Sequence, residues 1–355
     1  MKNNNIDFTL YKNLLSRVRV PHPSYNMGLA ELKRSYDSVG TTDFPQCLHI
    51  VGASRAGKTC LINEFRKLYP SYRAQDGVQI RIVYAEIPPT GTIMGVMENI
   101  LYALGDPVWS KGTASNKLAR VIDQLEKCGC RMLVLDELQH LVDKGQNRML
   151  KQTRDWIKAL ANANRWAVVV CGLETSRAVI TQDAQLKARF DAEIRLPRFD
   201  WDDDALYTQF LGVLGGFQEG LAPFSLPDMQ DETVALRFYL ASGGLIGYVV
   251  KLLNRAIQDA IADKRTAIGL PELEKAFRRA ISFASDIPAE EGPFVSKLIG
   301  TPPEEHRARC VKLATAEDDV KEKVPKALVT STLPSKKKTC VPKKEHRRQM
   351  GGAFA

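Results

Sequence analysis

Five short apolar runs alternate with stretches of helical spacing between residues 41 and 200. The apolar runs are CLHIVG (47–52), VQIRIVYAEI (78–87), RMLVLDE (131–137), WAVVVCG (166–172) and AEIRLP (192–197). Helical spacing of apolar residues marks 59–70, 92–104, 115–128 and 147–163 within this range, and 26–39 before it. Short apolar runs are typical of buried strands, and their alternation with helices favours a parallel sheet covered on both faces. We therefore predict an α/β domain with a parallel five-stranded sheet over 41–200.

The pattern changes after Pro197, because only helical spacing is found beyond it. The segments that carry this spacing are 202–215, 231–242, 246–263 and 270–284. They predict a small all-helical domain over 201–285. At the other end of the chain, residues 1–40 are expected to form an N-terminal extension and a lead-in helix before the α/β domain. Residues 286–355 are rich in Pro, Lys, Glu and Thr, a composition that predicts a basic and mostly disordered tail.

The net charge of +9 is concentrated at the end of the chain. Residues 321–355 hold ten basic and two acidic residues, so this segment alone carries +8 and the rest of the chain is close to neutral. No apolar run approaches the roughly 20 residues that cross a bilayer, and the N-terminus lacks the apolar region of a signal peptide. The seven cysteines show no metal-ligand spacing. We expect reduced thiols in a cytoplasmic protein with no membrane segment.

Residues 52–59, GASRAGKT, match the phosphate-binding pattern G-x-x-x-x-G-K-[ST] between an apolar strand and an amphipathic helix. Glycines let the backbone curl so that N–H groups point at phosphate oxygens, and the helix presents its positive end to the same anion. Lys58 should reach the β- and γ-phosphates of ATP, and Thr59 should ligate Mg²⁺. The predicted nucleotide-binding residues are Gly52, Ala53, Ser54, Arg55, Ala56, Gly57, Lys58, Thr59 and Cys60.

Two carboxylates end the third apolar run. Asp136 should lie at the carboxyl edge of the sheet beside the phosphate loop, where it would hold Mg²⁺ through a water. Glu137 should polarise a water for attack on the γ-phosphate. Acidic residues are also common at a solvated helix start, and that alternative would win without the phosphate loop upstream.

Two further residues are candidates for the hydrolytic site. Thr175 follows the fourth strand, where a polar side chain can sense the γ-phosphate, although it could equally cap the next helix. Arg189 precedes the fifth strand and is our candidate for an arginine finger that acts on a neighbouring subunit. The alternatives are an ordinary arginine at a helix end and a finger supplied by Arg195, which a strand would hold less freely.

The string Asp136-Glu137-Leu138-Gln139-His140-Leu141, with ALGDP at 103–107 and the phosphate loop, resembles the TniB/TnsC family over about 20–285. These proteins are AAA+ ATPases that regulate DNA transposition. The resemblance implies an AAA+ P-loop NTPase fold in which 201–285 form the lid. It also implies assembly on duplex DNA as a homo-oligomeric ring or helical filament. Such an assembly would link a TniQ-type target-selection protein to a DDE transposase, and hydrolysis would control its disassembly.

The resemblance also suggests where DNA contacts lie, because the family's inner-face contacts fall between the second strand and the DE strand. In this chain that interval offers Thr92, Lys111, Thr113 and Lys117, each of which could also be an ordinary surface residue. The sequence departs from the AAA+ pattern in the lid, where G-x-x-R would place an arginine and this chain has Gly247. Lys251 or Arg255 could substitute for that arginine, or both could be solvated helix residues.

Other functional classes remain open at this stage. An AAA+ replication initiator or loader shares the same motifs, and a signalling NTPase without a DNA role is a weaker alternative. An initiator would usually append a DNA-reading domain after the lid, for which 286–355 are too short and too polar. A kinase should show a dense Arg cluster in its lid, which 202–285 do not contain. These features favour the transposition reading.

Overall fold

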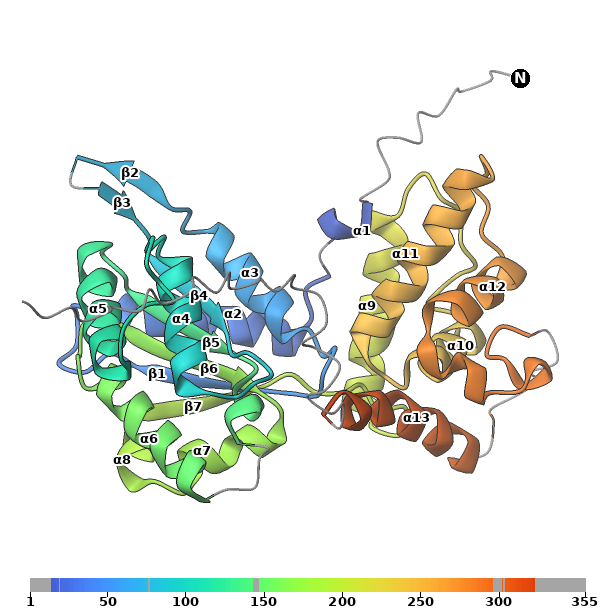
Figure 1. Cartoon of the computed structure of the whole chain (residues 1–355). Helices are drawn as coiled ribbons and strands as arrows, with labels where there is room; N and C mark the ends of the chain where they lie inside the picture. The colour runs from blue at the N-terminus through green and yellow to red at the C-terminus, as the bar shows by residue number, and fades with distance from the viewer. Residues whose placement is uncertain are drawn as a thin grey trace, which may run out of the picture. The chain divides into compact units, whose positions relative to one another are not determined.

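The computed structural model describes residues 14–18, 20–75, 77–142, 147–295, 302 and 304–322 (Figure 1). The chain divides into one compact unit over Met1–Glu317 and a second over Asp318–Ala355. The predicted tail from residue 323 onward lies outside the described residues.

A five-stranded parallel sheet forms the centre of the first domain. Its strands are β1 (Cys47–Val51), β4 (Ile82–Glu86), β5 (Met132–Asp136), β6 (Ala167–Gly172) and β7 (Phe190–Arg195). The strand order is β4-β5-β6-β1-β7, and each neighbouring pair is parallel. The sheet predicted from the five apolar runs is therefore confirmed, and the carboxyl ends of its strands meet at one edge.

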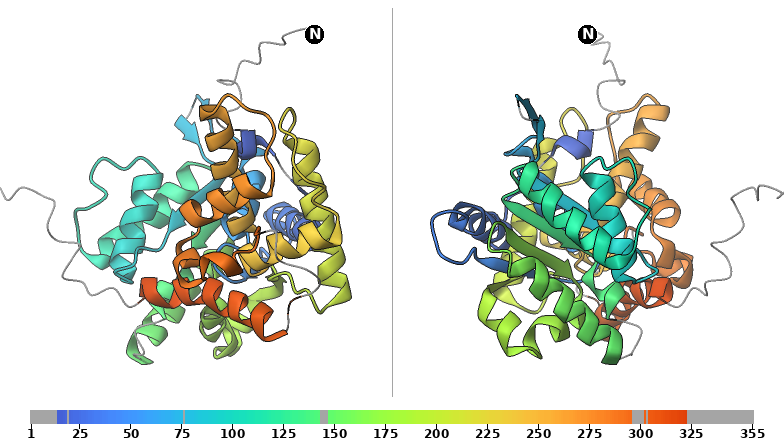
Figure 2. Two further views of the ribbon diagram at one scale, coloured as in Figure 1. Left: turned by 90° about the vertical axis from the view of Figure 1, so that its right-hand side faces the viewer. Right: turned by 60° about the vertical axis from the view of Figure 1, so that its left-hand side comes forward.

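Helices cover both faces of the sheet, as can be followed in Figure 2, where α2 is blue and α4 and α5 are teal to green. One face carries α2 (Pro23–Ser38) and α3 (Lys58–Lys67). The other carries α4 (Ile93–Ala103), α5 (Ala114–Lys127), α6 (Asn147–Ala161), α7 (Arg177–Thr181) and α8 (Ala184–Arg189). Successive residues of β5 alternate between the two cores, with Met132 and Val134 on the α3 side and Leu133 and Leu135 on the other. This two-sided burial explains why each strand is a continuous apolar run.

The second apolar run is divided in the structure, which corrects its predicted extent of 78–87. Gly77–Gln79 (β3) pairs antiparallel with Tyr72–Ala74 (β2) in a separate hairpin, and the sheet strand begins only at Ile82. Tyr72 and Val78 are among the exposed large side chains of this hairpin. An exposed two-stranded hairpin has no buried face, so periodicity gives little sign of it.

The second domain is a helical bundle, with α9 (Asp204–Gly220), α10 (Glu232–Ser242), α11 (Ile246–Ala262) and α12 (Leu270–Ala280) around one apolar core. Asp203 and Asp231 cap the first two of these helices with their carboxylates. No single helix among the described residues is long and apolar enough to cross a membrane. The pair α10 and α11 meets that length and composition only together, and it is bent by 103° at its break.

Segments outside the predicted helical domain also join its core. The N-terminal segment has a short helix, α1 (Leu14–Arg17), whose Leu15 is 4% exposed in that core. Helix α13 (Glu304–Glu322) buries Cys310 and Ala314 there as well. The tail predicted from residue 286 therefore begins too early. Only a narrow face of α13 packs against this core, so the helix needs few apolar residues. The composition of the segment alone could not reveal that face.

Candidate functional site

The phosphate-binding loop connects β1 to α3 at the carboxyl edge of the sheet. Gly57 has a φ of 101°, in the left-handed region that favours glycine, and it immediately precedes the first residue of α3. A Cβ on Gly52 would lie 2.6 Å from the carbonyl oxygen of Leu196, so a side chain there would collide with backbone. Lys58 is 5% exposed, and its Nζ donates to the carbonyl oxygens of Gly52 at 2.9 Å and Ala53 at 3.0 Å. The lysine therefore lies folded inside its own loop, at the positive end of the helix.

Oxygen ligands for a hard cation meet at the same edge. Asp136 ends β5 and is 1% exposed, and its Oδ2 accepts from Thr59 Oγ1 at 2.8 Å and from Tyr84 Oη at 3.0 Å. Its Oδ1 accepts from the backbone N–H of Glu137 at 2.9 Å. A carboxylate beside a hydroxyl fits Mg²⁺, which takes oxygen ligands and keeps several waters. Asp136 and Thr59 are the two residues that would hold it, as the sequence predicts.

Tyr84, which lies on β4 beside β5, is a further residue of the site that was not predicted from the sequence. Burial and the neighbouring Asp136 raise the pKa of the Tyr84 phenol, so the tyrosine remains a hydrogen-bond donor to the carboxylate. Its only sequence signal is its position near the end of an apolar run. The parallel register that pairs Tyr84 with Val134 determines its distance from Asp136.

Glu137 lies in the left-handed region, with φ 63° and ψ 42°, just before the short helix η2 (Leu138–Leu141). A non-glycine residue in this region is uncommon and marks a constrained position. Glu137 lines the same cavity as the phosphate loop. The structure therefore brings together Lys58, Thr59, Asp136 and Glu137, four of the residues predicted to act on nucleotide.

A cavity of about 310 Å³ extends from the phosphate loop between the two domains of this unit. One wall is formed by Ser54–Cys60 with Glu137. The other wall is apolar and comes from two regions, the N-terminal segment and the helical domain. The apolar residues are Leu15, Val18, Val20, Val213, Phe217, Ile246 and Val250. An apolar wall with a few polar groups is typical of a small-molecule site.

The N-terminal part of this wall was not predicted, because residues 1–40 were interpreted only as an extension and a lead-in helix. Val18 and Val20 reach the cavity by packing onto glycines of α9. A Cβ on Gly216 would lie 2.5 Å from Val20, and one on Gly220 would lie 2.7 Å from Val18. These two glycines let the N-terminal segment lie directly on the helical domain.

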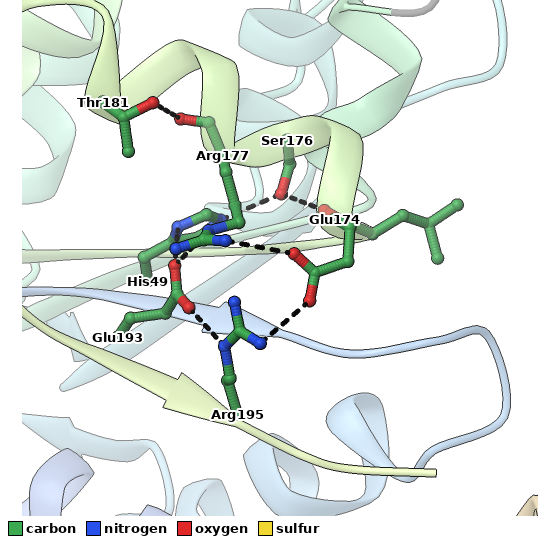
Figure 3. Close-up of polar contacts among 8 residues, drawn as sticks. His49, Glu174, Ser176, Arg177, Thr181, Glu193 and Arg195 are labelled. Atoms are coloured by element: carbon green, nitrogen blue, oxygen red, sulfur yellow. Dashed lines mark hydrogen bonds and ion pairs between the residues drawn. The ribbon is translucent and has the colours of Figure 1, made fainter.

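Thr175 lies exposed in the short helix η3 (Glu174–Ser176), directly after β6. Helix α7 begins at Arg177 with Ser176 as its preceding residue, so Thr175 is not the cap of that helix. Ser176 is buried and its Oγ lies 2.9 Å from Nε2 of His49, on β1 (Figure 3). Burial lowers the pKa of His49 to about 4, against the opposing effect of Glu193, so the ring is neutral at neutral pH.

Arg189 ends α8 at the amino edge of the sheet, opposite the phosphate loop. Cys47 pairs with Phe190 and Val51 with Arg195, so about five residues, or roughly 16 Å, separate Arg189 from the carboxyl edge. Its guanidinium donates to Ala161 O at 3.2 Å and Asn164 Oδ1 at 2.6 Å and stacks on Phe44. Arg189 is therefore remote from the nucleotide loop of its own chain.

The rival candidate, Arg195, lies at the carboxyl end of β7 within a charged cluster (Figure 3). Its Nε donates to Glu193 at 2.8 Å, and its NH1 lies 3.7 Å from Glu174. Its side chain is 55% exposed. Two carboxylates of the same chain thus already engage this arginine.

The four candidate DNA contacts differ in position. Thr92 and Thr113 are exposed, and their hydroxyls cap α4 and α5 by accepting from Gly95 N and Asn116 N. Lys111 is exposed in the loop between these helices. Lys117 is 1% exposed, and its ammonium donates to Glu98 and to Ser110 O. Lys117 therefore does not present its charge to solvent, which departs from the expectation for a DNA contact.

The loop that carries Lys111 is held in place by Arg120 of α5. Arg120 donates to Asp106, and its NH1 donates to Lys111 O at 2.9 Å. Hydrogen bonds from this guanidinium lower the pKa of the buried Asp106 carboxyl. The ALGDP segment thus has a structural role, since its aspartate fixes the α4–α5 loop.

The helical domain meets the phosphate loop at Gly247, where the AAA+ pattern would place arginine. The N–H of Gly247 donates to Arg55 O at 2.9 Å, and the Arg55 guanidinium lies 4.6 Å from the centre of the Tyr248 ring. Of the two possible substitutes, Arg255 is paired with Asp259 on its own helix. Neither Lys251 nor Arg255 is among the residues that line the cavity.

Comparisons with known proteins agree with this geometry. The sequence model described as bacterial TniB protein matches residues 9–201. No curated protein matches the sequence. Among solved structures, Cdc6p of Pyrobaculum aerophilum is 19% identical with a TM-score of 0.55, covering 76% of this chain and 71% of that chain. The ORC1 protein of Aeropyrum pernix, in complex with DNA, is 16% identical with a TM-score of 0.56, covering 77% and 69%. The fold is therefore that of an AAA+ P-loop ATPase.

Proposed function

The chain belongs to the bacterial TniB protein family, and from this premise we propose that it is an Mg-dependent ATPase that assembles on duplex DNA and regulates transposition. The observation that carries the proposal is the bond between Thr59 and Asp136 beside the phosphate loop. It joins two oxygen ligands next to Lys58 and Glu137, which is the set of groups that nucleotide hydrolysis requires.

Each group has a separate part in the proposed hydrolysis. The backbone N–H groups of Ser54–Thr59 and the ammonium of Lys58 bind the phosphates, for which Lys58 exchanges its carbonyl partners for phosphate oxygens. The apolar wall around Val18 and Phe217 fits the base of the nucleotide. Bound Mg²⁺ would neutralise charge on the β- and γ-phosphates. Glu137 accepts the proton of the attacking water, and Thr175, on the turn after β6, would sense the γ-phosphate.

We further propose that the active site is completed between subunits of a homo-oligomer. Arg189 lies at the amino edge of its own sheet, so it can serve only the nucleotide of another chain. A repeated head-to-tail contact of this kind generates a ring or a helical filament. Its own contacts with Ala161 O and Asn164 are hydrogen bonds that the finger would exchange for a neighbour's γ-phosphate.

DNA would lie against the exposed α4–α5 surface that carries Thr92, Lys111 and Thr113. Phosphate contacts of this kind position DNA without reading its sequence, so target choice would come from protein partners. The partners implied by the family are a TniQ-type target-selection protein and a DDE transposase, with cytoplasmic action in a bacterium. A replication-initiator role is the alternative, because Cdc6p and ORC proteins share the fold.

Imaging tests this proposal directly. Purified protein is mixed with duplex DNA, with and without a non-hydrolysed ATP analogue, and examined by negative-stain electron microscopy. The wild type should form rings or filaments on DNA only with the analogue, and Lys58→Ala should form none. Lys67→Ala is the matched control, because Lys67 is exposed on the same helix and paired with Glu64. A wild type that stays monomeric with DNA and analogue contradicts the proposal.

A pull-down separates the two functional alternatives. Assembled protein on DNA should retain a TniQ-type protein and a DDE transposase from the same mobile element. Retention of a replicative helicase in their place would favour the initiator alternative.

A further inference from the structure

Gln139 is a buried polar residue that the proposed mechanism leaves without a role. It lies in η2, two residues after Glu137, and is 3% exposed. Its neighbours in the same string have structural roles. Leu138 and Leu141 are fully buried in the core. The ring of His140 lies 2.9 Å from Ile87 O through Nδ1, which fastens η2 to the end of β4. A buried amide has to satisfy both its donor and its acceptor, so its two partners show what it holds together.

The two ends of the Gln139 amide contact two different parts of the site. Its Nε2 donates to Oε2 of Glu137. Its Oε1 accepts from the backbone N–H of Leu173 at 3.2 Å, on the turn that follows β6. One side chain thus joins the carboxylate of Glu137 to the turn that carries Thr175.

Gly172 leaves the space that this bridge needs. A Cβ on Gly172 would lie 3.0 Å from Oε1 of Gln139 and 2.7 Å from Cβ of Ser176. The close approach of the amide to the end of β6 therefore depends on the residue at this position having no side chain.

The turn is also held by Ser176, whose contact with His49 is drawn in Figure 3. Ser176 Oγ donates its single proton to Leu173 O at 2.5 Å, so Nε2 of His49 must be the donor in its 2.9 Å contact with the same hydroxyl. Both the N–H and the carbonyl of Leu173 are thereby fixed to buried groups. The turn is a rigid reference, and Gln139 ties Glu137 to it.

We propose that Gln139 is a positioning residue, which sets the place of the Glu137 carboxylate relative to the turn at 173–175. The proposal rests on the proposed ATPase function. Glu137 stands in a left-handed backbone conformation next to an open cavity, so its carboxylate can rotate unless a donor restrains it. The amide of Gln139 is that donor. The catalytic base and the turn that senses the γ-phosphate then keep a fixed separation, which proton transfer from a bound water requires.

The first test removes the amide and keeps the length of the side chain. Gln139→Met should lower kcat for ATP about 10- to 100-fold, the range for loss of a group that orients a reacting residue. Affinity for a non-hydrolysed ATP analogue should stay within about twofold, because the amide contacts neither the phosphate loop nor the apolar wall. Gln258→Met, an exposed glutamine on α11, is the matched control and should hydrolyse like the wild type. Wild-type or increased hydrolysis by Gln139→Met overturns the proposal.

A double-variant comparison separates positioning from a general structural effect. If Gln139 acts through Glu137, adding Gln139→Met to Glu137→Gln should cause no further loss of kcat. A further loss of about tenfold in that background would mean that Gln139 acts independently, which overturns the proposal. If Glu137→Gln itself hydrolyses like the wild type, the catalytic assignment of Glu137 fails and the positioning role falls with it. If Glu137→Gln is inactive and Gln139→Met is normal, only the positioning role fails.

Discussion

Gly247 offers a sharp prediction, because the AAA+ pattern and the structure disagree about what an arginine would do there. The pattern suggests that arginine at 247 would add a contact to the nucleotide. In the structure, a Cβ at this position would lie 2.7 Å from Cβ of Arg55, 3.0 Å from its carbonyl oxygen and 3.2 Å from its Cα. Two of these three atoms are backbone atoms of the phosphate loop, which cannot move aside as a flexible side chain would.

The size of the effect follows from that overlap. Overpacking costs about 1–3 kcal/mol, and displacement of the lid would also weaken the bond from Gly247 N to Arg55 O, worth about 1 kcal/mol. This free-energy cost destabilises the conformation in which the lid and the phosphate loop together enclose the cavity. Gly247→Ala and Gly247→Arg should therefore each weaken ATP binding about 5- to 700-fold, at about 1.4 kcal/mol for each factor of ten.

The assay is titration with a fluorescent ATP analogue, with thermal unfolding measured in parallel. Gly212→Ala is the matched control, because no heavy atom lies within 4 Å of a Cβ built there on the lid helix α9. This control should bind nucleotide normally and unfold at the same or a slightly higher temperature. Binding by Gly247→Arg as tight as that of the wild type, or tighter, would refute the reasoning.

Three other predictions concern the subunit junction, the buried histidine and the tail. Arg189→Ala and Lys58→Ala should each lack ATPase activity alone and recover part of it when mixed, whereas Arg195→Ala should retain activity; no recovery after confirmed co-assembly counts against a finger acting across subunits. The pKa of His49 is about 4 in the folded chain and 6.5 unfolded, with Glu193 and Arg177 facing it, so its contribution to stability is complete above about pH 6.5 and falls as the pH drops towards 4. Between about pH 7 and about pH 5, the free energy of unfolding measured in urea should fall by ~2 kcal/mol more in the wild type than in His49→Gln. Equal decreases would contradict this. Deleting 323–355, which hold nine basic residues and one acidic residue, should flatten the salt dependence of DNA binding without loss of ATPase activity, and an unchanged slope would argue for another role of the tail.

The sheet and its carboxyl edge could be predicted because burial leaves a strong signal. Every residue of β5 is buried, so the strand reads as an unbroken apolar run that ends in Asp136. The spacing of the phosphate loop is fixed because its backbone N–H groups have to point at phosphate oxygens. The apolar run of β1 shows that the loop follows that strand. Together these two features were enough to bring Lys58, Thr59, Asp136 and Glu137 to one edge.

Contacts between distant segments could not be predicted in this way. Lys117 is neutralised by Glu98, which lies on another helix 19 residues upstream, and no spacing rule links the two. Val18 and Val20 belong to a polar segment, and their place in the cavity depends on Gly216 and Gly220 about 200 residues later.

The role of Gln139 illustrates the limit of reading a motif. The string that contains it carries the family resemblance, but the two partners of its amide are a residue two positions away and a backbone N–H 34 positions away. Only the packing of β5 beside β6 brings that N–H within reach.

The most direct test of the whole account is the behaviour of Glu137→Gln on DNA. The variant keeps the size of the side chain and removes the base, so it should bind ATP, assemble on duplex DNA and remain there. Single-turnover hydrolysis and the lifetime of the DNA-bound assembly are measured together for this variant and the wild type. Hydrolysis by Glu137→Gln should be reduced at least about 100-fold, and its assembly should outlive that of the wild type. Hydrolysis at the wild-type rate, or assemblies that dissociate as quickly as those of the wild type, would contradict it.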